Sequence, residues 1–495
     1  MNPDVIVIGA GFAGLSAAAA LAERSVRVLV LEARPTLGGR ATAFTDPATG
    51  ERVDNGQHVM FGCYHETFQF LRRIGTDSHV LVQRQLTVDT VDRAGRRSRL
   101  KCPVLPSPLH LLAGVLTWDA LGWRDRFAAL RIGRAIMEVP RRLKPALYTS
   151  ATSTRWRGAG ASGGASSSAG RAEQTLRNGR VDGLRRAGRA ERTRRAEQQL
   201  ETLTVREWLQ AHGQTPRLIE LLWEPLAVAA LNQPIDIAAA TTFVAVLAQV
   251  FGRDPRSASL ALPLKPLDEL YALPARRYLE QRGGAVETGA VARIDVSADA
   301  PNVMVGGRPL SARAVICAVP WYALAEVFPD RPAALTAVLD AAAHTVASPI
   351  VTVNLWFDRV VTDQMFIGLP GRTMQWVFDK RTVFGEQASH LSLVSSGAAS
   401  VVGRSNQELI DLAVHEVRDA LSAARSAVMT RGVVVREKRA TFSVAPGQPP
   451  RPSIETPVPG LFLAGDWIDT GLPATIEGAV VSGHRAAAAV MDVIR

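Results

Sequence analysis

The chain has 495 residues, of which 47% are hydrophobic and 21% charged, proportions typical of a globular protein with a buried core. This length suffices for two domains or for one large, interrupted domain. The three cysteines, Cys63, Cys102 and Cys317, share no metal-ligand spacing and cannot form a disulfide framework. Their scarcity excludes a disulfide-stapled secreted scaffold and favours a reducing compartment.

The formal net charge of +11 is concentrated in one segment. Residues 151–200 hold eleven arginines and four acidic residues and so contribute +7 of the total, which leaves +4 for the rest. This segment is rich in Ala, Gly, Ser and Arg, and it has too few large aliphatic side chains to offset the entropy of ordering. A disordered surface insertion and an out-of-frame translation of GC-rich sequence both remain open. We expect no nucleic-acid partner.

Membrane-spanning helices are not expected, because no segment reaches about 18–20 uninterrupted apolar residues. Residues 225–249 come nearest, but Asn232, Gln233 and Asp236 interrupt them. Residues 109–123 are shorter and admit two interpretations, an interfacial helix on a lipid surface or an ordinary core helix. The first expected strand begins at about residue 4, which leaves no room for a signal peptide. We expect a cytoplasmic protein, with peripheral contact to the inner face of the plasma membrane left open.

In chain order, residues 1–34 predict a β-α-β unit, with a strand at 5–8, a helix at 12–24 and a strand at 27–31. Further apolar strands are expected at 314–319 and 461–464, as central members of the same parallel sheet. Residues 204–250 have a helical pattern. Residues 349–357 and 391–396 predict strands, and residues 405–424 predict a helix. The chain thus predicts an α/β nucleotide-binding domain interleaved with a second, mixed α+β domain.

The turn after the first strand carries the glycine spacing of dinucleotide-binding proteins. Gly9 permits a tight turn, Gly11 allows backbone to approach a pyrophosphate, and Gly14 allows the helix to pack on the strand. The helix N-terminus then offers free N–H groups and a partial positive charge to the phosphates. Glu32 ends the second strand, where a carboxylate accepts hydrogen bonds from ribose hydroxyls and disfavours a 2′-phosphate. FAD or NAD therefore fits better than NADP.

Later segments favour a flavin over a nicotinamide. Gly38 and Gly39 allow a second loop to approach the cofactor, and Arg40 can neutralise a phosphate. Residues 53–58 form a polar turn suited to pass beside an isoalloxazine ring. Asp466 can accept a ribityl hydroxyl, and a helix starting near Thr475 can direct backbone N–H groups at the flavin.

These motifs resemble the flavin amine oxidase and phytoene desaturase superfamily. The segments that carry the likeness are Gly9–Gly14, Glu32-Ala33-Arg34, Gly38-Gly39-Arg40 and Leu463-Ala464-Gly465-Asp466. Finer motifs are similar to those of the hydroxysqualene dehydroxylase family of bacterial hopanoid synthesis, namely Asp54-Asn55-Gly56-Gln57-His58, Leu221–Leu226, Gln375–Asp379, Arg436–Phe442 and Thr470–Ala479. The likeness covers nearly the whole chain except about 150–200.

The resemblance implies a Rossmann-like FAD-binding domain at 1–100, 265–325 and 455–495. It implies a substrate-binding domain at 101–150, 201–264 and 326–454. It also implies FAD as cofactor, no metal, and a polyisoprenoid substrate, hydroxysqualene, reduced to squalene by hydride from reduced FAD. The expected cofactor contacts are Gly9, Gly11, Phe12, Ala13, Gly14, Glu32, Ala33, Arg34, Gly39, Arg40, Gly56, Gln57, His58, Val291, Gly465, Asp466, Thr475 and Ile476.

The leaving hydroxyl needs a proton, and four residues are candidates for its donor: Asp54, His58, Asp379 and Glu477. Each has a structural alternative. Asp54 can brace a turn, His58 can hydrogen-bond FAD, Asp379 can pair with Lys380 or Arg381, and Glu477 can stabilise a helix start. Trp223, Trp376 and Trp467 are expected in the substrate wall or the core.

Three competing functions remain open at this stage. The first is a carotenoid-type desaturase, in which hydride would be transferred in the other direction. The second is an amine oxidase, which the apolar substrate domain supports less well. The third is a catalytically inactive, FAD-binding partner of squalene-making enzymes. The oligomeric state and the flavin reductant are not indicated.

Overall fold

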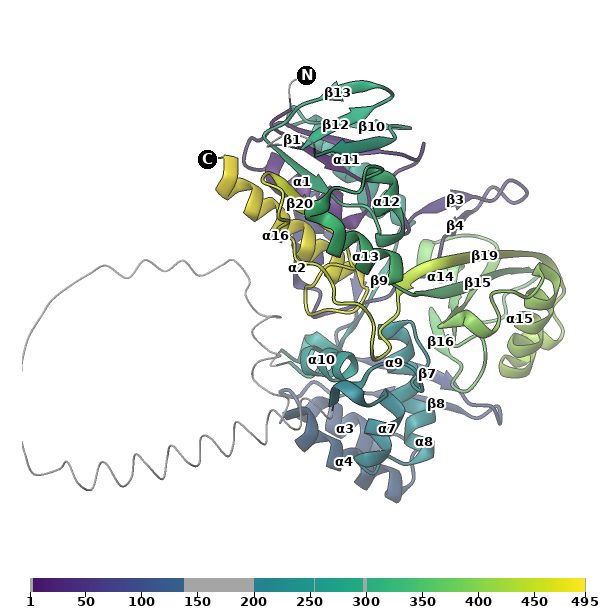
Figure 1. Ribbon diagram of the computed structural model, residues 1–495. Coiled ribbons are helices and arrows are strands. Elements are labelled where there is room, and N and C mark those ends of the chain that lie inside the picture. Colours follow the sequence, from purple (N-terminus) through teal and green to yellow (C-terminus); the bar gives the residue numbers. More distant parts are fainter. Residues whose placement is uncertain (1–2, 138–199, 253, 297–300, 495) are drawn as a thin grey trace, which may run out of the picture.

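The computed structural model describes residues 3–137, 200–252, 254–296 and 301–494 (Figure 1). The Arg-rich segment predicted at 151–200 lies, apart from Leu200, outside the described residues. The expected α/β class is confirmed, with one parallel sheet and a separate sheet that is almost entirely antiparallel.

The parallel sheet gathers strands from distant parts of the chain. Its five strands run in the order β10-β2-β1-β14-β20, with bounds Ala285–Thr288, Val28–Glu32, Val5–Ile8, Ala314–Cys317 and Leu461–Leu463. Every neighbouring pair is parallel. The predicted assembly of this sheet from separate pieces is therefore confirmed. The edge strand β10 was not predicted, because only one of its four residues is buried and it lacks a long apolar run.

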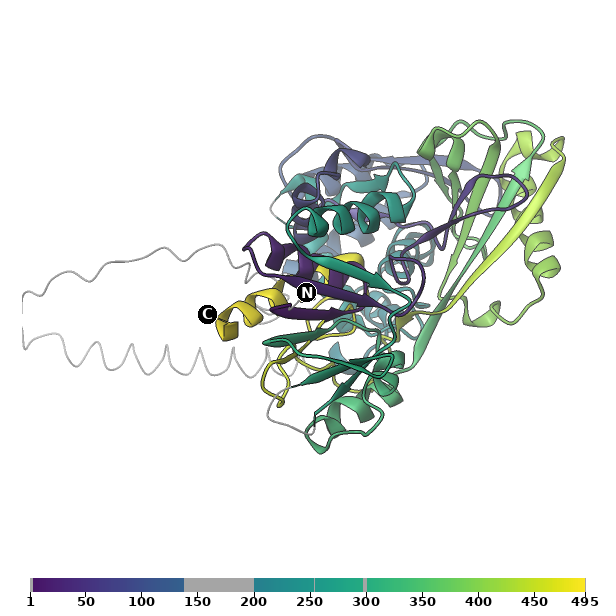
Figure 2. The ribbon, with the colours of Figure 1, turned by 90° about the horizontal axis from the view of Figure 1, so that it is seen from above.

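The first and last helices pack side by side against this sheet (Figures 1 and 2). They are α1 (Phe12–Ala22) and α16 (Ile476–Ile494). Gly483 allows the two helices to approach closely, because a Cβ built on it would lie 2.3 Å from the Ala13 carbonyl oxygen. Gly14 allows α1 to pack on the turn after β1, since a Cβ there would lie 1.9 Å from the Gly9 carbonyl oxygen. Two further helices, α2 (His65–Arg73) and α11 (Leu273–Glu280), also pack on α1.

The second sheet has seven strands in the order β19-β15-β18-β17-β16-β7-β8. Their bounds are Met429–Phe442, Ala347–Phe357, Ser389–Ser396, Trp376–Asp379, Phe366–Gly368, Thr87–Val91 and Arg97–Lys101. Alternate residues of β15 divide between its faces: Val351, Val353 and Leu355 pack in one core cluster with helix α15 (Asn406–Ala420). Thr352, Asn354 and Trp356 therefore point to the opposite face. The predicted strands at 349–357 and 391–396 and the helix at 405–424 are confirmed.

A group of helices lies below the parallel sheet in the view of Figure 1, at the level of β7 and β8. It consists of α3 (Leu109–Thr117), α4 (Trp123–Met137), α7 (Val205–Ala211), α8 (Pro216–Leu218), α9 (Glu224–Leu231) and α10 (Ala240–Val250), with a π-helical turn at Ile219–Trp223. The helical pattern predicted for 204–250 is confirmed. Within the described ranges, no helix combines the length and the apolar character needed to cross a bilayer.

Short elements complete the structure. They are β3 (Ala43–Thr45), β4 (Arg52–Asp54), β5 (Met60–Phe61), β6 (Val80–Val82), β9 (Leu260–Pro263), β11 (Ala292–Asp295), β12 (Asn302–Val305), β13 (Arg308–Leu310), α12 (Leu324–Val327), α13 (Thr336–His344) and α14 (Lys380–Phe384). The division of the chain into two domains stays a prediction. Strand β7 and all of β8 except Lys101 lie in the range 1–100 expected for the FAD-binding domain, yet they belong to the second sheet.

Candidate functional site

The turn between β1 and α1 is shaped by its glycines. Gly9 has φ +104°, and a Cβ there would lie 2.7 Å from the Ala318 carbonyl oxygen, so both backbone angle and space require glycine. Leu15 N donates the first intrahelical bond, to Gly11 O. The N–H groups of Phe12, Ala13 and Gly14 therefore have no acceptor within the helix and are free to bind a ligand at the start of α1.

A cradle lies between this turn and the loop at 38–40. A Cβ on Gly11 would meet no atom within 4 Å, and one on Gly39 would meet only Gly11, at 3.5 Å from its Cα. Two backbone segments thus leave room that side chains would fill, next to a helix N-terminus. This geometry fits a dinucleotide pyrophosphate, which helix N–H groups and the helix dipole favour.

The carboxylate of Glu32 is buried at the edge of this cradle. It accepts hydrogen bonds from Ala10 N at 2.8 Å and Arg34 N at 3.0 Å. An ionised carboxylate has about four acceptor sites, so two backbone bonds leave capacity for ribose hydroxyls. Ala290 N donates to Glu32 O and places the exposed Val291 beside it. Glu32, Ala33, Arg34 and Val291 therefore lie close together, and their contacts with the cofactor stay a prediction.

The C-terminal motif meets the N-terminal one directly. Arg40 Nη2 lies 2.5 Å from Asp466 Oδ1, and Arg40 Nη1 donates to Ala440 O at 2.8 Å. Gly465, with φ +148°, donates its N–H to Ser482 Oγ of α16 at 2.8 Å. The expected helix start is confirmed: α16 begins at Ile476, and Thr475 Oγ1 accepts from Gly478 N at 3.0 Å.

A buried ion pair organises the polar segment at 54–58. Lys380, with 0% of its side chain exposed, donates to Asp54 Oδ2 at 2.9 Å and to Gln57 Oε1 at 2.7 Å. Asp54 Oδ1 accepts from Leu267 N at 3.2 Å. Both Asp54 oxygens thus accept hydrogen bonds, one of them from a buried cation. Asp54 is therefore the counter-ion of Lys380, and its use as an acid stays a prediction.

The other three candidate acids lie in different surroundings. Asp379 is the N-cap of α14 and accepts from Arg381 N at 3.1 Å, so it pairs with Arg381, although it is buried and not on a surface loop. Glu477 accepts from Glu66 N, Thr67 N and Thr67 Oγ1 at the start of α2, and burial raises its pKa to about 7. Both carboxylates therefore have structural roles.

The ring of His58 bonds the backbone through one of its two nitrogens. Its Nδ1 lies 2.8 Å from Gly56 O, and because a carbonyl only accepts, Nδ1 carries the proton. Nε2 is then the acceptor of the neutral ring or a donor of the charged one. Burial lowers the pKa of His58. The assignment of any one of the four as the proton donor stays a prediction.

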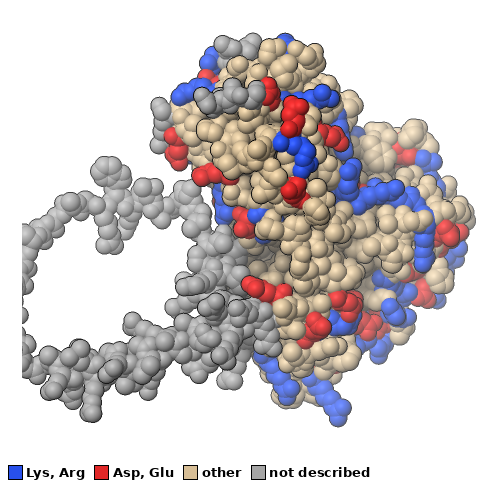
Figure 3. All heavy atoms as spheres, viewed as in Figure 1, with Lys and Arg blue, Asp and Glu red and all other residues tan. Residues whose placement is uncertain are grey.

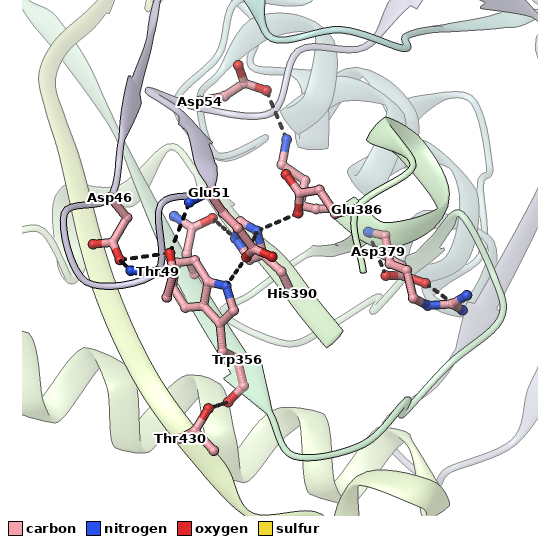
Figure 4. A network of polar contacts seen from close by, with 12 residues as sticks. Asp46, Thr49, Glu51, Asp54, Trp356, Asp379, Glu386, His390 and Thr430 are labelled. Atoms are coloured by element: carbon pink, nitrogen blue, oxygen red, sulfur yellow. Dashed lines mark hydrogen bonds and ion pairs between the residues drawn. The ribbon is translucent and has the colours of Figure 1, made fainter. Parts of the chain in front are cut away.

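A second polar cluster was not predicted from the sequence (Figure 4). His390 lies 3.1 Å from Glu386 Oε2 through Nδ1 and 3.0 Å from Asn354 Oδ1 through Nε2. Trp356 stacks on His390 and donates to Glu51. Burial lowers the pKa of His390 to about 3 and raises that of Glu386 to about 7. No local motif indicates this cluster, because its members come from distant parts of the chain. They lie just before β4, in β15, in β18 and in the loop after α14.

A large apolar cavity opens beside the segment at 54–58. Its volume is about 1320 Å³, above the range of about 300–1,000 Å³ usual for small-molecule sites. Most of its lining is apolar and includes Val59, Phe61, Leu86, Leu111, Leu112, Val115, Trp118, Leu221, Trp223, Leu262, Phe366, Trp376, Phe378 and Val394. Polar side chains also line it, among them Gln57, Tyr64, Arg93, Glu220, Arg372 and Gln375. The cavity thus suits a long hydrocarbon chain that enters polar surroundings near Gln57.

The three tryptophans named from the sequence divide between wall and core. Trp223 and Trp376 line the cavity, whereas Trp467 donates Nε1–H to Val319 O at 3.0 Å and packs in the core. Trp118 is a wall residue that the sequence did not single out.

The visible face of the molecule carries basic and acidic side chains interspersed, without a large field of one sign (Figure 3). This distribution agrees with the modest charge expected outside the Arg-rich segment, and it gives no extended basic track on that face.

Comparisons with known proteins place this geometry in context. The sequence profile described as "Flavin containing amine oxidoreductase" matches residues 12–491. Hydroxysqualene dehydroxylase of Rhodopseudomonas palustris is 28% identical over 495 residues, covering 99% of each chain. The 15-cis-phytoene desaturase of an Oncidium hybrid cultivar is 24% identical, covering 99% of this chain and 78% of that protein.

Solved structures share the fold at lower identity. Putrescine oxidase bound to putrescine superposes with a TM-score of 0.68 at 17% identity, covering 99% of both chains. Cyclohexylamine oxidase from Brevibacterium oxydans superposes with a TM-score of 0.65 at 16% identity, also covering 99% of both. These likenesses confirm the expected combination of a Rossmann-like nucleotide domain with a second, mixed domain.

Proposed function

We propose, on the premise that this chain belongs to the flavin-containing amine oxidoreductase family, that it reduces hydroxysqualene to squalene in hopanoid synthesis. The protein is an oxidoreductase, and FAD is its cofactor. The observation that carries the proposal is the apolar cavity of about 1320 Å³ with Gln57 in its lining. The full-length likeness to a hydroxysqualene dehydroxylase supports the same substrate.

The chain's own residues would hold FAD at the sites described above. The cradle between Gly11 and Gly39 would take the pyrophosphate, and Glu32 the adenosine ribose. The paired Arg40 and Asp466 and the start of α16 would bracket the flavin half. When bound and reduced, FAD supplies a hydride.

The reaction replaces the C–O bond of an allylic alcohol by a C–H bond. The hydroxyl takes a proton and leaves as water, and the allylic carbon accepts the hydride, so alcohol, proton and hydride give squalene and water. The protein must hold the chain still, exclude bulk water and bring a proton to the oxygen. The aliphatic and aromatic wall serves the first two needs, and His58 is the candidate acid with a ring nitrogen left for the third.

The substrate would enter from a lipid surface beside helices α3 and α4. Leu111, Leu112 and Val115 of α3 and Leu130 of α4 line the cavity. On the outer side, Trp123 is 71% exposed and Phe127 63% exposed, and the basic Arg124 and Arg131 are exposed nearby. A helix that exposes both large aromatic and basic side chains is typical of segments that lie in a membrane interface. This peripheral contact is part of the proposal.

A carotenoid-type desaturase is the second candidate, because phytoene desaturases also match nearly the whole chain. One product assay separates the two functions. Purified holoenzyme with reduced FAD is incubated without oxygen with hydroxysqualene, and in parallel, oxidised, with phytoene. Squalene detected by gas chromatography in the first reaction supports the proposal. Phytoene consumption without any squalene would refute it.

A further inference from the structure

We propose that the side-chain amide of Gln57, oriented by the buried Lys380, donates a hydrogen bond to the oxygen of the substrate and so selects a polyisoprenoid alcohol over the matching hydrocarbon. This inference rests on the proposed function and deepens it, because it names the group that distinguishes substrate from product. From the sequence, Gln57 is expected only as a contact of the cofactor.

The orientation of the amide follows from its partner. Gln57 Oε1 lies 2.7 Å from Lys380 Nζ. An ammonium group donates and never accepts, so the amide oxygen must face Lys380 and the NH2 group must point away from it. Lys380 is itself fixed, because it also bonds Asp54 at 2.9 Å and lies 3.8 Å from the ring centre of Phe384. The amide therefore cannot reverse without losing a charge-assisted bond.

The NH2 group is left without a protein acceptor. Gln57 Nε2 is shielded from solvent and has no hydrogen-bond partner among the described residues. A buried donor without an acceptor costs free energy. A ligand oxygen that accepts its hydrogen bond would recover that cost on binding. The bond from Lys380 polarises the amide and strengthens the donor at its other end.

The position of Gln57 indicates what brings that oxygen. Gln57 lines the large cavity, and Val59 and Phe61, which follow it, pack against the apolar cluster of Leu262, Phe366 and Phe378 in the same wall. A ligand of this cavity is mainly hydrocarbon, and Gln57 offers its oxygen a donor whose direction is fixed by Lys380. A site with such a donor rejects the analogue that lacks the oxygen.

The cavity offers a matched control in Gln375. Its side chain lines the same cavity, but both ends of its amide are hydrogen-bonded to Ser396. Oε1 accepts from Ser396 N at 2.7 Å, and Nε2 donates to Ser396 O at 3.2 Å. Removing this amide changes the wall without removing an unpaired donor.

The test measures binding without turnover. Oxidised holoenzyme in detergent micelles is titrated with hydroxysqualene and, separately, with squalene. Binding is followed by the fluorescence of the wall tryptophans, and FAD affinity and the flavin spectrum are recorded for each variant. Wild type is expected to prefer the alcohol. Gln57→Met is expected to lower this preference by about 5- to 100-fold, and Gln375→Met is expected to leave it unchanged.

Gln57→Glu keeps an acceptor for Lys380 and the shape of the side chain but removes the donor, so it should lose the preference as well. This variant keeps the test decisive if Gln57→Met does not fold. Preference retained in both variants would overturn the inference while leaving the proposed function intact, as would altered FAD affinity with the preference unchanged. Equal binding of both ligands by wild type would count against the inference, and, with no squalene formed in the product assay, against the proposed function too.

Discussion

Arg40 Nη2 lies 2.5 Å from Asp466 Oδ1 and joins segments that are 426 residues apart in the chain. The loop after β2 and the turn after β20 thereby lie together at one wall of the proposed cofactor site. Because each side chain neutralises the other in partly buried surroundings, the two ends of the chain are held together in the folded protein. The proposed cofactor site would therefore depend on packing at the ends of the chain as well as on the groups expected to touch FAD.

Substitution of Glu32 should weaken FAD retention. Its carboxylate bonds Ala10 N and Arg34 N at the cradle, and Glu32→Ala removes these bonds together with the ribose acceptor. We expect the FAD Kd to rise by about 10- to 100-fold, measured by flavin fluorescence on dilution. Glu287→Ala, in the adjacent strand β10 with an exposed carboxylate, is the control and should retain FAD normally. Unchanged occupancy in Glu32→Ala would refute the ribose role.

Substitution of Gly483 should loosen the first and last helices. A Cβ at this position would lie 2.3 Å from Ala13 O and 2.4 Å from Ser16 Oγ, so α16 must move away from α1. We expect Gly483→Ala to lower the free energy of unfolding by about 1–3 kcal/mol, seen in urea titrations of the holoenzyme. Gly403→Ala, where a Cβ meets nothing within 4 Å, should change it little. Equal stability of the two variants would show that α1 and α16 do not need this contact.

Acid should destabilise the protein through His390. Burial holds the folded pKa of this residue at about 3, below its ordinary value of 6.5, so only the unfolded chain takes up the proton between these limits. Stability is therefore lost as pH falls through this window, by up to about 1.4 kcal/mol per pH unit. His390→Gln removes this contribution. Glu386, whose folded pKa is raised to about 7, acts in the opposite direction between its ordinary value of 4.5 and 7.

The comparison of wild type with His390→Gln isolates the histidine. Between pH 6.5 and pH 5, wild type should lose about 2 kcal/mol more than the variant, followed by urea unfolding at each pH. Parallel pH profiles would mean that His390 is already charged in the folded protein.

The exposed aromatic side chains of α4 should control lipid binding. Trp123 and Phe127 leave large apolar surfaces in water, and inserting each into a bilayer interface gains on the order of 1–2 kcal/mol. The double variant Trp123→Ser/Phe127→Ser should therefore bind anionic liposomes at least about tenfold more weakly in flotation assays. Val428→Ser, at an exposed apolar site elsewhere, is the control. Equal flotation of all three proteins would remove α4 from the membrane contact.

Much of the fold followed from local patterns. The strands around Val7, Ile316 and Phe462 were predicted because strands buried on both faces have unbroken apolar runs. The edge strand β10 was missed because its Glu287 and Thr288 are exposed and resemble a loop. Its position depends on pairing with β2, which no local pattern specifies.

The candidate site was predictable where a motif needs backbone geometry and not where side chains meet across the chain. Gly9 and Gly11 are specified by turn angle and space, which the glycine spacing records. The sequence indicates Lys380 only as a partner of Asp379, yet in the structure its ammonium group is buried against Asp54, 326 residues earlier. Its role arises from the docking of α14 on the segment at 54–58, a tertiary contact without a sequence signature.

A single-turnover experiment shows whether hydride passes from reduced FAD to hydroxysqualene on this protein. Holoenzyme is photoreduced without oxygen and mixed with excess hydroxysqualene, and flavin absorbance and squalene are measured together. We expect the flavin to be reoxidised and one squalene to form per flavin. Flavin that stays reduced, with hydroxysqualene recovered unchanged, would contradict this expectation.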